Sequence, residues 1–144
     1  MTVAGTDRAS VTAPGPAEVL LAVTAAHRTG QPLHPELLAL GAHFERRAHT
    51  APRYRMLALP GPGVRRGGIV ATAHGGTALE VELHRMPTCA LGTLLCALPA
   101  PLAIGRIELV DGTVLGILCT GHPAGAVDVS SHGSWPAYLR SVTV

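Results

Sequence analysis

The sequence predicts an α+β domain built on one mixed, mostly antiparallel sheet with two or three short helices. Three observations lead to this prediction: stretches of period-two alternation, an Asp-Gly pair between two apolar stretches, and prolines at the starts of short helical segments. With 144 residues, of which 47% are hydrophobic and 14% charged, the chain is long enough for one self-supporting core. Residues 1–15 are small and polar, so we expect a flexible leader before a domain that spans 16–144.

Local patterns place the elements of the first part of the domain in order. An apolar run over 19–23 is typical of a buried strand, and a stretch of small residues, 24–30, follows it. Pro35 favours the start of a helix whose exposed end would carry the charged residues 45–47. The apolar stripe predicted for this helix consists of Leu37, Leu40 and Phe44.

A strand and a hairpin are predicted next. The strand begins at Arg53, where apolar residues start to alternate, and the prolines and glycines of 60–63 end it. The stretches 68–73 and 78–84 flank a His-Gly-Gly turn, which indicates a hairpin. The two faces of its second arm would be Leu79, Val81 and Leu83 on one side and Glu80, Glu82 and His84 on the other. We therefore expect Glu82 to be solvated.

The last elements are a short helix, a second hairpin and a final helix. Pro87 favours the start of the short helix, which carries Leu91, Leu94 and Leu95. An Asp-Gly pair at 111–112, between 104–110 and 113–119, is the strongest local sign of a hairpin in the chain. The segment 133–139 predicts a turn that leads into the final helix.

Composition excludes several classes of function. Eleven Arg and no Lys stand against nine acids, for a net charge of +2, and only 3% of residues are aromatic, so we expect no nucleic-acid partner. Prolines interrupt the longest uncharged span, 86–105, which argues against a membrane segment. Three cysteines without paired spacing do not predict a disulfide framework, and we expect a cytoplasmic protein.

Histidine is the one enriched titratable residue, with eight copies. No closely spaced His or Cys ligands are present, so we predict no metal site, and Cys89 and Cys96 are expected to face the core. Neither a Gly-x-Ser-x-Gly motif nor a phosphate-binding loop occurs. His27 stands out by position, because it follows a buried strand within a run of small residues. A hydrogen-bonded loop histidine is the alternative interpretation.

Several segments, taken in order, resemble the C-terminal domain of allophanate hydrolases. Leu21 to Leu33 is similar to a strand that leads into Gly-Ala-His, two residues, Gly, one residue and Pro-Leu-Asn in that family. Further similar blocks are 50–60, 79–83, Pro99-Ala100-Pro101-Leu102-Ala103-Ile104-Gly105, 108–112, 116–119 and 128–139. The blocks cover roughly residues 17–140, and their order is more specific than any one of them.

The resemblance implies a fold like that of gamma-glutamylcyclotransferases, with a barrel-like sheet. In the family this domain follows an amidase, and it is thought to decarboxylate the N-carboxycarbamate formed from allophanate. The family's proposed catalytic histidine corresponds to His27. Such chemistry needs a proton for nitrogen and a fixed carboxylate, and it requires no cofactor.

The same resemblance places the substrate-binding residues in the matched blocks. We expect the amides of 26–30 to hold the carboxylate oxygens and Thr29 to add a hydroxyl. The residues expected to bind substrate are Ala26, Arg28, Thr29, Gly30, Glu82, Pro101, Ile104, Gly105 and Trp135. The chain departs from the family pattern at Ala25, His34, Ala103, Ser134 and Pro136, and the last replaces an Arg that could contact a carboxylate.

Three functions stay open at this point. The first is a decarboxylase acting on a carbamoyl or carboxylate compound through His27. The second is cyclisation by intramolecular acyl transfer on the same fold, for which Glu82 is the acid to watch. The third is a non-catalytic module that docks onto a separate amidase, which the departures from the family pattern support. A homodimer is a further partner that the apolar composition allows.

Overall fold

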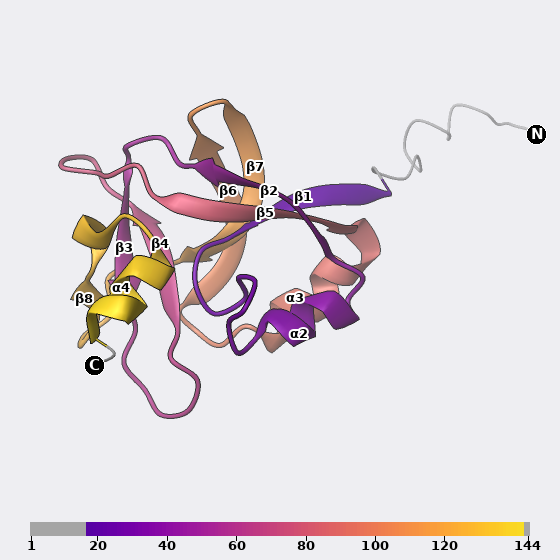
Figure 1. Cartoon of the computed structure of the whole chain (residues 1–144), viewed down its shortest axis with the longest axis horizontal. Coiled ribbons are helices and arrows are strands. Elements are labelled where there is room, and N and C mark those ends of the chain that lie inside the picture. Colours follow the sequence, from indigo (N-terminus) through magenta and orange to yellow (C-terminus); the bar gives the residue numbers. More distant parts are fainter. Residues whose placement is uncertain (1–16, 143–144) are drawn as a thin grey trace, which may run out of the picture.

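The computed structural model describes residues 17–142, which fold into one curled sheet with short helices packed against it (Figure 1). The predicted leader, residues 1–15, lies outside the described residues. The strands are β1 (Glu18–Val23), β2 (His43–His49), β3 (Tyr54–Ala58), β4 (Gly67–Ala71), β5 (Glu80–Pro87), β6 (Leu102–Leu109), β7 (Gly112–Cys119) and β8 (Val127–Asp128). The helices are α2 (His34–Ala39), α3 (Leu91–Ala97) and α4 (Trp135–Val142), with 3-10 turns η1 (Thr88–Ala90) and η2 (Ser130–His132).

The sheet is mixed and mostly antiparallel, as the sequence predicts. Its order is β2-β5-β1-β7-β4-β3-β8, and β6 pairs along the full length of β7. Only the β1–β7 and β4–β7 pairs are parallel. β1 lies between β5 and β7, so both of its edges are paired, and a hydrophobic cluster packs against each of its faces, which explains its continuous apolar run.

Two hydrophobic clusters lie on opposite faces of β1. Ala22 belongs to a cluster with Met56 and Trp135, and Figure 1 shows α4 beside β3, β4 and β8 on that side. Leu21 and Val23 point the other way, into a second cluster that includes residues of α2 and α3. The chain therefore leaves β1 between two cores, and the first residues of the following loop are buried from the start.

The predicted helix from Pro35 is shorter than expected, and its continuation is a strand. Helix α2 ends at Ala39, and Gly41 then adopts a φ of +89°, which side-chain-bearing residues rarely adopt. The charged residues 45–47 and Phe44 lie on β2, which pairs with β5. Phe44 is 49% exposed and does not complete an apolar helix stripe. The prediction was wrong because Phe44 stands at helical spacing from Leu37 and Leu40, although the chain turns between them at Gly41.

The hairpin predicted around residues 74–76 is also wrong. Strand β4 pairs with β3 and β7, whereas β5 pairs with β1 and β2. Alternation identifies a strand but carries no information on its partner. By contrast, the Asp-Gly pair does join two paired strands, because Leu109 of β6 pairs with Gly112 of β7.

The remaining helices form where the prolines predict them. Helix α3 follows the 3-10 turn after Pro87, and α4 follows Ser134. Cys89 and Cys96, which we expected in the core, are exposed, because the buried side of α3 is formed by Leu94. None of the helices in the described part of the chain has the length and apolar character needed to span a membrane.

Candidate functional site

Residues 24–33, here called the His27 loop, connect β1 to α2 and carry the candidate catalytic histidine. Three backbone hydrogen bonds fold the loop: the amide of Arg28 donates to the carbonyl of Ala25, that of Gln31 to the carbonyl of Arg28, and that of Leu33 to the carbonyl of Ala26. Ala25 and Ala26 are buried, because small side chains let the backbone pack closely behind the sheet. The fold thus turns the side chains of His27 and Arg28 inward, while Thr29 and Gly30 are exposed.

His27 is 4% exposed, and its Nε2 atom has no hydrogen-bond partner in the described part of the chain. The nearest acidic atom is Oε1 of Glu36 on α2, at 3.8 Å, too far for a hydrogen bond. The loop is also held by His34, whose Nδ1 lies 3.1 Å from the carbonyl oxygen of His27 and donates to it. The ring is therefore buried with its Nε2 left without a partner, while His34 fixes the backbone at His27.

Burial and the nearby charges set the pKa of His27. Burial lowers the pKa below the ordinary 6.5, because the charged ring loses its hydration. The carboxylate of Glu36 raises the pKa, and the positive charge of Arg66 lowers it again. The net result is a pKa below 6.5, so that the protonated ring is a stronger acid than a free imidazolium.

The other side of the loop is bound to β5 through a buried acid. Glu82 is 3% exposed, so the expectation of a solvated strand position was wrong. Its Oε1 accepts hydrogen bonds from the amide of Thr29 at 2.8 Å, from the hydroxyl of Thr29 at 3.0 Å and from Nε2 of His84 at 3.1 Å. Alternation predicted correctly that Glu82 and His84 share a face, but strand β2 and the His27 loop cover that face.

The charges around Glu82 are balanced within the protein. Burial raises the pKa of Glu82, but the amide of Thr29, His84 and the Thr29 hydroxyl, together with the charge of Arg28, outweigh it and leave the pKa below 4.5. Arg28 is itself buried, and its guanidinium binds the carboxylate of Glu80 at 2.6 Å. Glu82 is therefore an ionised internal anchor for the loop. The Thr29 amide, expected to hold a substrate carboxylate, already holds this one.

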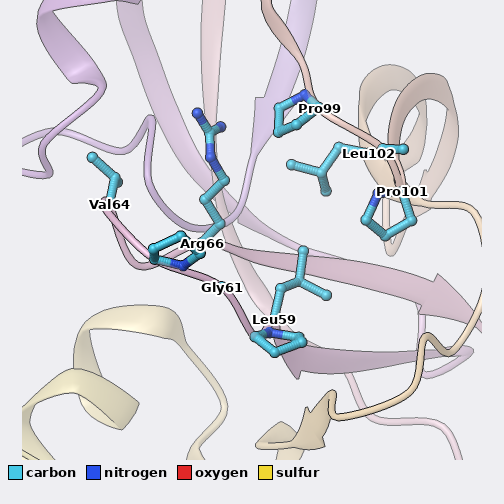
Figure 2. Close-up of a pocket in the computed structure, with 10 residues that line it drawn as sticks. Leu59, Gly61, Val64, Arg66, Pro99, Pro101 and Leu102 are labelled. Carbon is cyan, nitrogen blue, oxygen red and sulfur yellow. The ribbon is translucent and has the colours of Figure 1, made fainter.

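A pocket of about 310 Å³ opens beside two proline-rich segments (Figure 2). We call it the proline-lined pocket. Its lining consists of Leu59, Pro60, Gly61, Pro62, Val64, Arg66, Pro99, Ala100, Pro101 and Leu102. Arg66 is the charged residue of this lining, and its charge reaches His27, although His27 does not itself line the pocket. A second pocket, of about 340 Å³, is lined by Thr29, Phe44, Arg47 and Glu82.

The structure brings some of the predicted site residues together and separates others. The residues from Ala26 to Gly30 share one loop with Glu82 bound beneath it, and Pro101 lies in the proline-lined pocket. Gly105 pairs with Gly116 between β6 and β7, and Ile104 packs against the second cluster. Trp135 is 1% exposed, and its ring lies against Gly67, where a Cβ atom would be only 2.4 Å away.

Sequence reasoning missed Arg66, Glu36 and His84. Arg66 follows a turn that we interpreted only as the end of a strand, and its pocket exists because 99–102 folds against that turn. Glu36 could have been found, because an acid in the first turn of a helix that begins at Pro35 lies near the loop before it. His84 had no signal beyond its alternation with Leu83.

Comparisons with known proteins agree with this architecture. Residues 19–140 match the protein family described as allophanate hydrolase C-terminal domain. The chain is 32% identical to urea amidolyase of Saccharomyces cerevisiae over 128 residues, which are 85% of the chain and 7% of that enzyme. It superposes on the allophanate hydrolase of Kluyveromyces lactis with a TM-score of 0.82 and 30% identity. The match covers 87% of this chain and 21% of that one. The chain thus spans a small part of these longer relatives.

Two further structures define the fold. A uropathogenic E. coli-specific protein is 32% identical with a TM-score of 0.77, and the match covers 88% of this chain and 98% of that one. An AIG2-like protein of Mus musculus matches 74% of this chain and 78% of its own with a TM-score of 0.56, at 15% identity, which shows a shared fold alone. The expected gamma-glutamylcyclotransferase-like architecture is confirmed.

Proposed function

This chain belongs to the family of allophanate hydrolase C-terminal domains, and we propose that it removes carbon dioxide from an N-carboxylated small molecule, with His27 as the proton donor. In this reaction the C–N bond of the N-carboxylate breaks and its electron pair stays on nitrogen. The carbon leaves as carbon dioxide, and nitrogen takes a proton from the His27 imidazolium. The neutral imidazole that remains then regains a proton from the solvent.

The observation that supports this proposal is the uncommitted Nε2 of a buried histidine. A general acid must have a nitrogen available for the substrate, and the Nε2 of His27 has no partner in the described chain. Its lowered pKa strengthens it as an acid, and Glu36, 3.8 Å away, stabilises the protonated form that must be present before the transfer.

Cyclisation with Glu82 as the base is the second candidate, and the pocket beside Glu82 favours it. Three donors converge on one oxygen of this carboxylate, and its pKa lies below 4.5. A base with such a low pKa abstracts protons poorly at neutral pH. We therefore assign Glu82 to holding the loop, and His27 to the chemistry.

Because N-carboxycarbamate is unstable, the test generates it within the assay by a second enzyme. A separate amidase acting on ¹³C-labelled allophanate releases N-carboxycarbamate, and the appearance of labelled carbon dioxide is followed with and without this protein. We expect the protein to accelerate carbon dioxide release. His27→Gln should reduce this acceleration by about a hundredfold or more, in keeping with general acid catalysis.

The matched control is His74→Gln, since His74 is exposed on a turn and contacts neither pocket. It should retain full activity. Full activity in the His27 variant would exclude His27 as the proton donor, and a ring-closed product by mass spectrometry would favour cyclisation. Binding to the amidase without any acceleration would indicate the non-catalytic module.

A further inference from the structure

Building on the proposed function, we infer that the proline-lined pocket binds a carboxylate group of the substrate through the guanidinium of Arg66. Arg66 was not among the residues that the sequence suggested. Arg28 was among them, but its guanidinium forms an ion pair with Glu80 and lies near Glu82. The two arginines therefore have opposite roles: Arg28 is neutralised inside the protein, and Arg66 is available.

Arg66 is half-buried and forms no ion pair with the described part of the chain. Five other arginines do have acidic partners: Arg28, Arg46, Arg53, Arg55 and Arg85. In Figure 2 the side chain of Arg66 extends along the pocket between Val64 and Pro99. A charge that is partly desolvated and has no internal partner favours an external anion.

The rest of the lining specifies a small ligand with little hydrogen bonding of its own. Its walls are leucine, valine and proline side chains with intervening backbone, and none of the described residues that line the pocket is acidic. A volume of about 310 Å³ suits a molecule with a few heavy atoms. Proline has a fixed φ, so the walls lose little conformational freedom when a ligand binds.

A guanidinium is suited to this ligand because its planar N–H groups match the two oxygens of a carboxylate. The position of Arg66 also couples binding to chemistry. Its positive charge acts on His27, and a bound anion would neutralise that charge. Anion binding and protonation of His27 should therefore favour each other, so that bound substrate raises the protonated share of His27.

The experiment uses malonate, the unreactive analogue of N-carboxycarbamate in which CH2 replaces NH, and measures its dissociation constant by calorimetry. Malonamide, which has the same skeleton and no charge, is the comparison ligand. We expect malonate to bind and malonamide to bind about tenfold more weakly or not at all. Arg66→Gln should weaken malonate binding about tenfold or more.

Arg65→Gln is the control, because Arg65 is the exposed neighbour and does not line the pocket. It should bind malonate like the natural protein. NMR titration of the His27 ring supplies a second readout: malonate should raise the pKa of His27 in the natural protein and leave it unchanged in Arg66→Gln.

The inference is overturned if malonate fails to bind at millimolar concentration, if Arg66→Gln binds it as well as Arg65→Gln, or if malonamide competes equally. These outcomes are separate from the test of catalysis. Malonate binding that depends on Arg66 without carbon dioxide release would refute the proposed function and leave this site intact. Carbon dioxide release with malonate binding that does not depend on Arg66 would do the reverse.

Discussion

His27 and His84 are both buried, and burial lowers the pKa of each, yet their surroundings differ in one decisive way. The Nε2 of His84 lies 3.1 Å from Oε1 of Glu82, which also receives the amide and hydroxyl of Thr29. The Nε2 of His27 has no such partner in the described chain, and each ring keeps one buried nitrogen without a hydrogen bond there, Nε2 in His27 and Nδ1 in His84. A protein interior normally satisfies its polar atoms, so an unsatisfied one marks a place where stability has not been optimised.

The comparison separates two sides of one loop. On the Glu82 side, ion pairs and hydrogen bonds between Glu82, Thr29, His84, Arg28 and Glu80 hold the loop to β5, although Nε of Arg28 and Nδ1 of His84 have no hydrogen-bond partner in the described chain. On the His27 side, an imidazole and the nearby Arg66 lack strong internal partners. Burial with one unpartnered nitrogen is common to both rings, so what separates them is the buried carboxylate that binds the other nitrogen of His84 and has no counterpart at His27.

The largest effect is expected on stability, at Glu82. Glu82→Ala should lower the free energy of unfolding by about 3 kcal/mol, because it leaves the Thr29 amide, His84 and Arg28 without their shared anion. Denaturant unfolding measures this, with Glu45→Ala, which removes an exposed ion pair with Arg85, as a control that should change little. Glu82→Gln keeps the shape and should lose less. An Ala variant as stable as the natural protein would contradict the anchoring role.

The next largest effect is the difference in the free energy of unfolding between two variants in which leucine replaces His84 or His27. His84→Leu should cost about 1.5 kcal/mol, since it removes a hydrogen bond to a charged group. His27→Leu should leave stability unchanged or raise it by up to about 1 kcal/mol, because it removes an unsatisfied buried nitrogen. The same unfolding measurements decide between them, and equal losses at both sites would remove the distinction that we draw.

A smaller effect is expected in the pH dependence of stability. Both histidines have a pKa below 6.5 in the folded protein, so the unfolded chain takes up protons first as the pH falls. The stability that the neutral rings provide is therefore complete above about pH 6.5 and declines below it. Melting temperatures between pH 7.5 and 5 measure the decline, which should be shallower in His27→Leu and in His84→Leu. An unchanged profile in both variants would mean that other groups cause it.

The smallest effect is a pair of opposite changes in the pKa of His27. Arg66→Gln should raise the pKa, because a positive charge that disfavours the protonated ring is lost. Glu36→Gln should lower it, because the stabilising negative charge is lost. NMR titration of the ring in the ligand-free protein measures both, and changes in the same direction would show that neither charge acts as described.

Local patterns were sufficient wherever one short segment determines its own conformation. The apolar run of β1, the turn between β6 and β7 and the proline before α3 each carry their signal within a few residues. The failure at β2 has the same origin, because residues 37–44 keep a helical spacing of apolar side chains while Gly41 turns the chain. The false hairpin at 74–76 arose because the partners of β4 and β5 are distant in the sequence.

In the candidate site, too, the sequence predicted what depends on a short segment and missed what depends on distant contacts. His27 could be selected from the sequence because it follows a buried strand in a segment that resembles a known family. The resemblance selected Arg28 and not Arg66, although both are arginines near glycines. What distinguishes them is Glu80, 52 residues after Arg28, which binds one guanidinium and leaves the other free.

From the order of its residues alone, this chain determines most of its strands and turns, its family and the histidine to study first, because each depends on neighbours along the backbone or on a motif read in order. Tertiary structure decides which charges are cancelled. Glu82 meets Thr29 across 53 positions, and 99–102 meets Arg66 across more than 30. Electrostatic availability depends on distance and burial in space, so only the folded chain distinguishes a charge that anchors the loop from one that remains for a ligand.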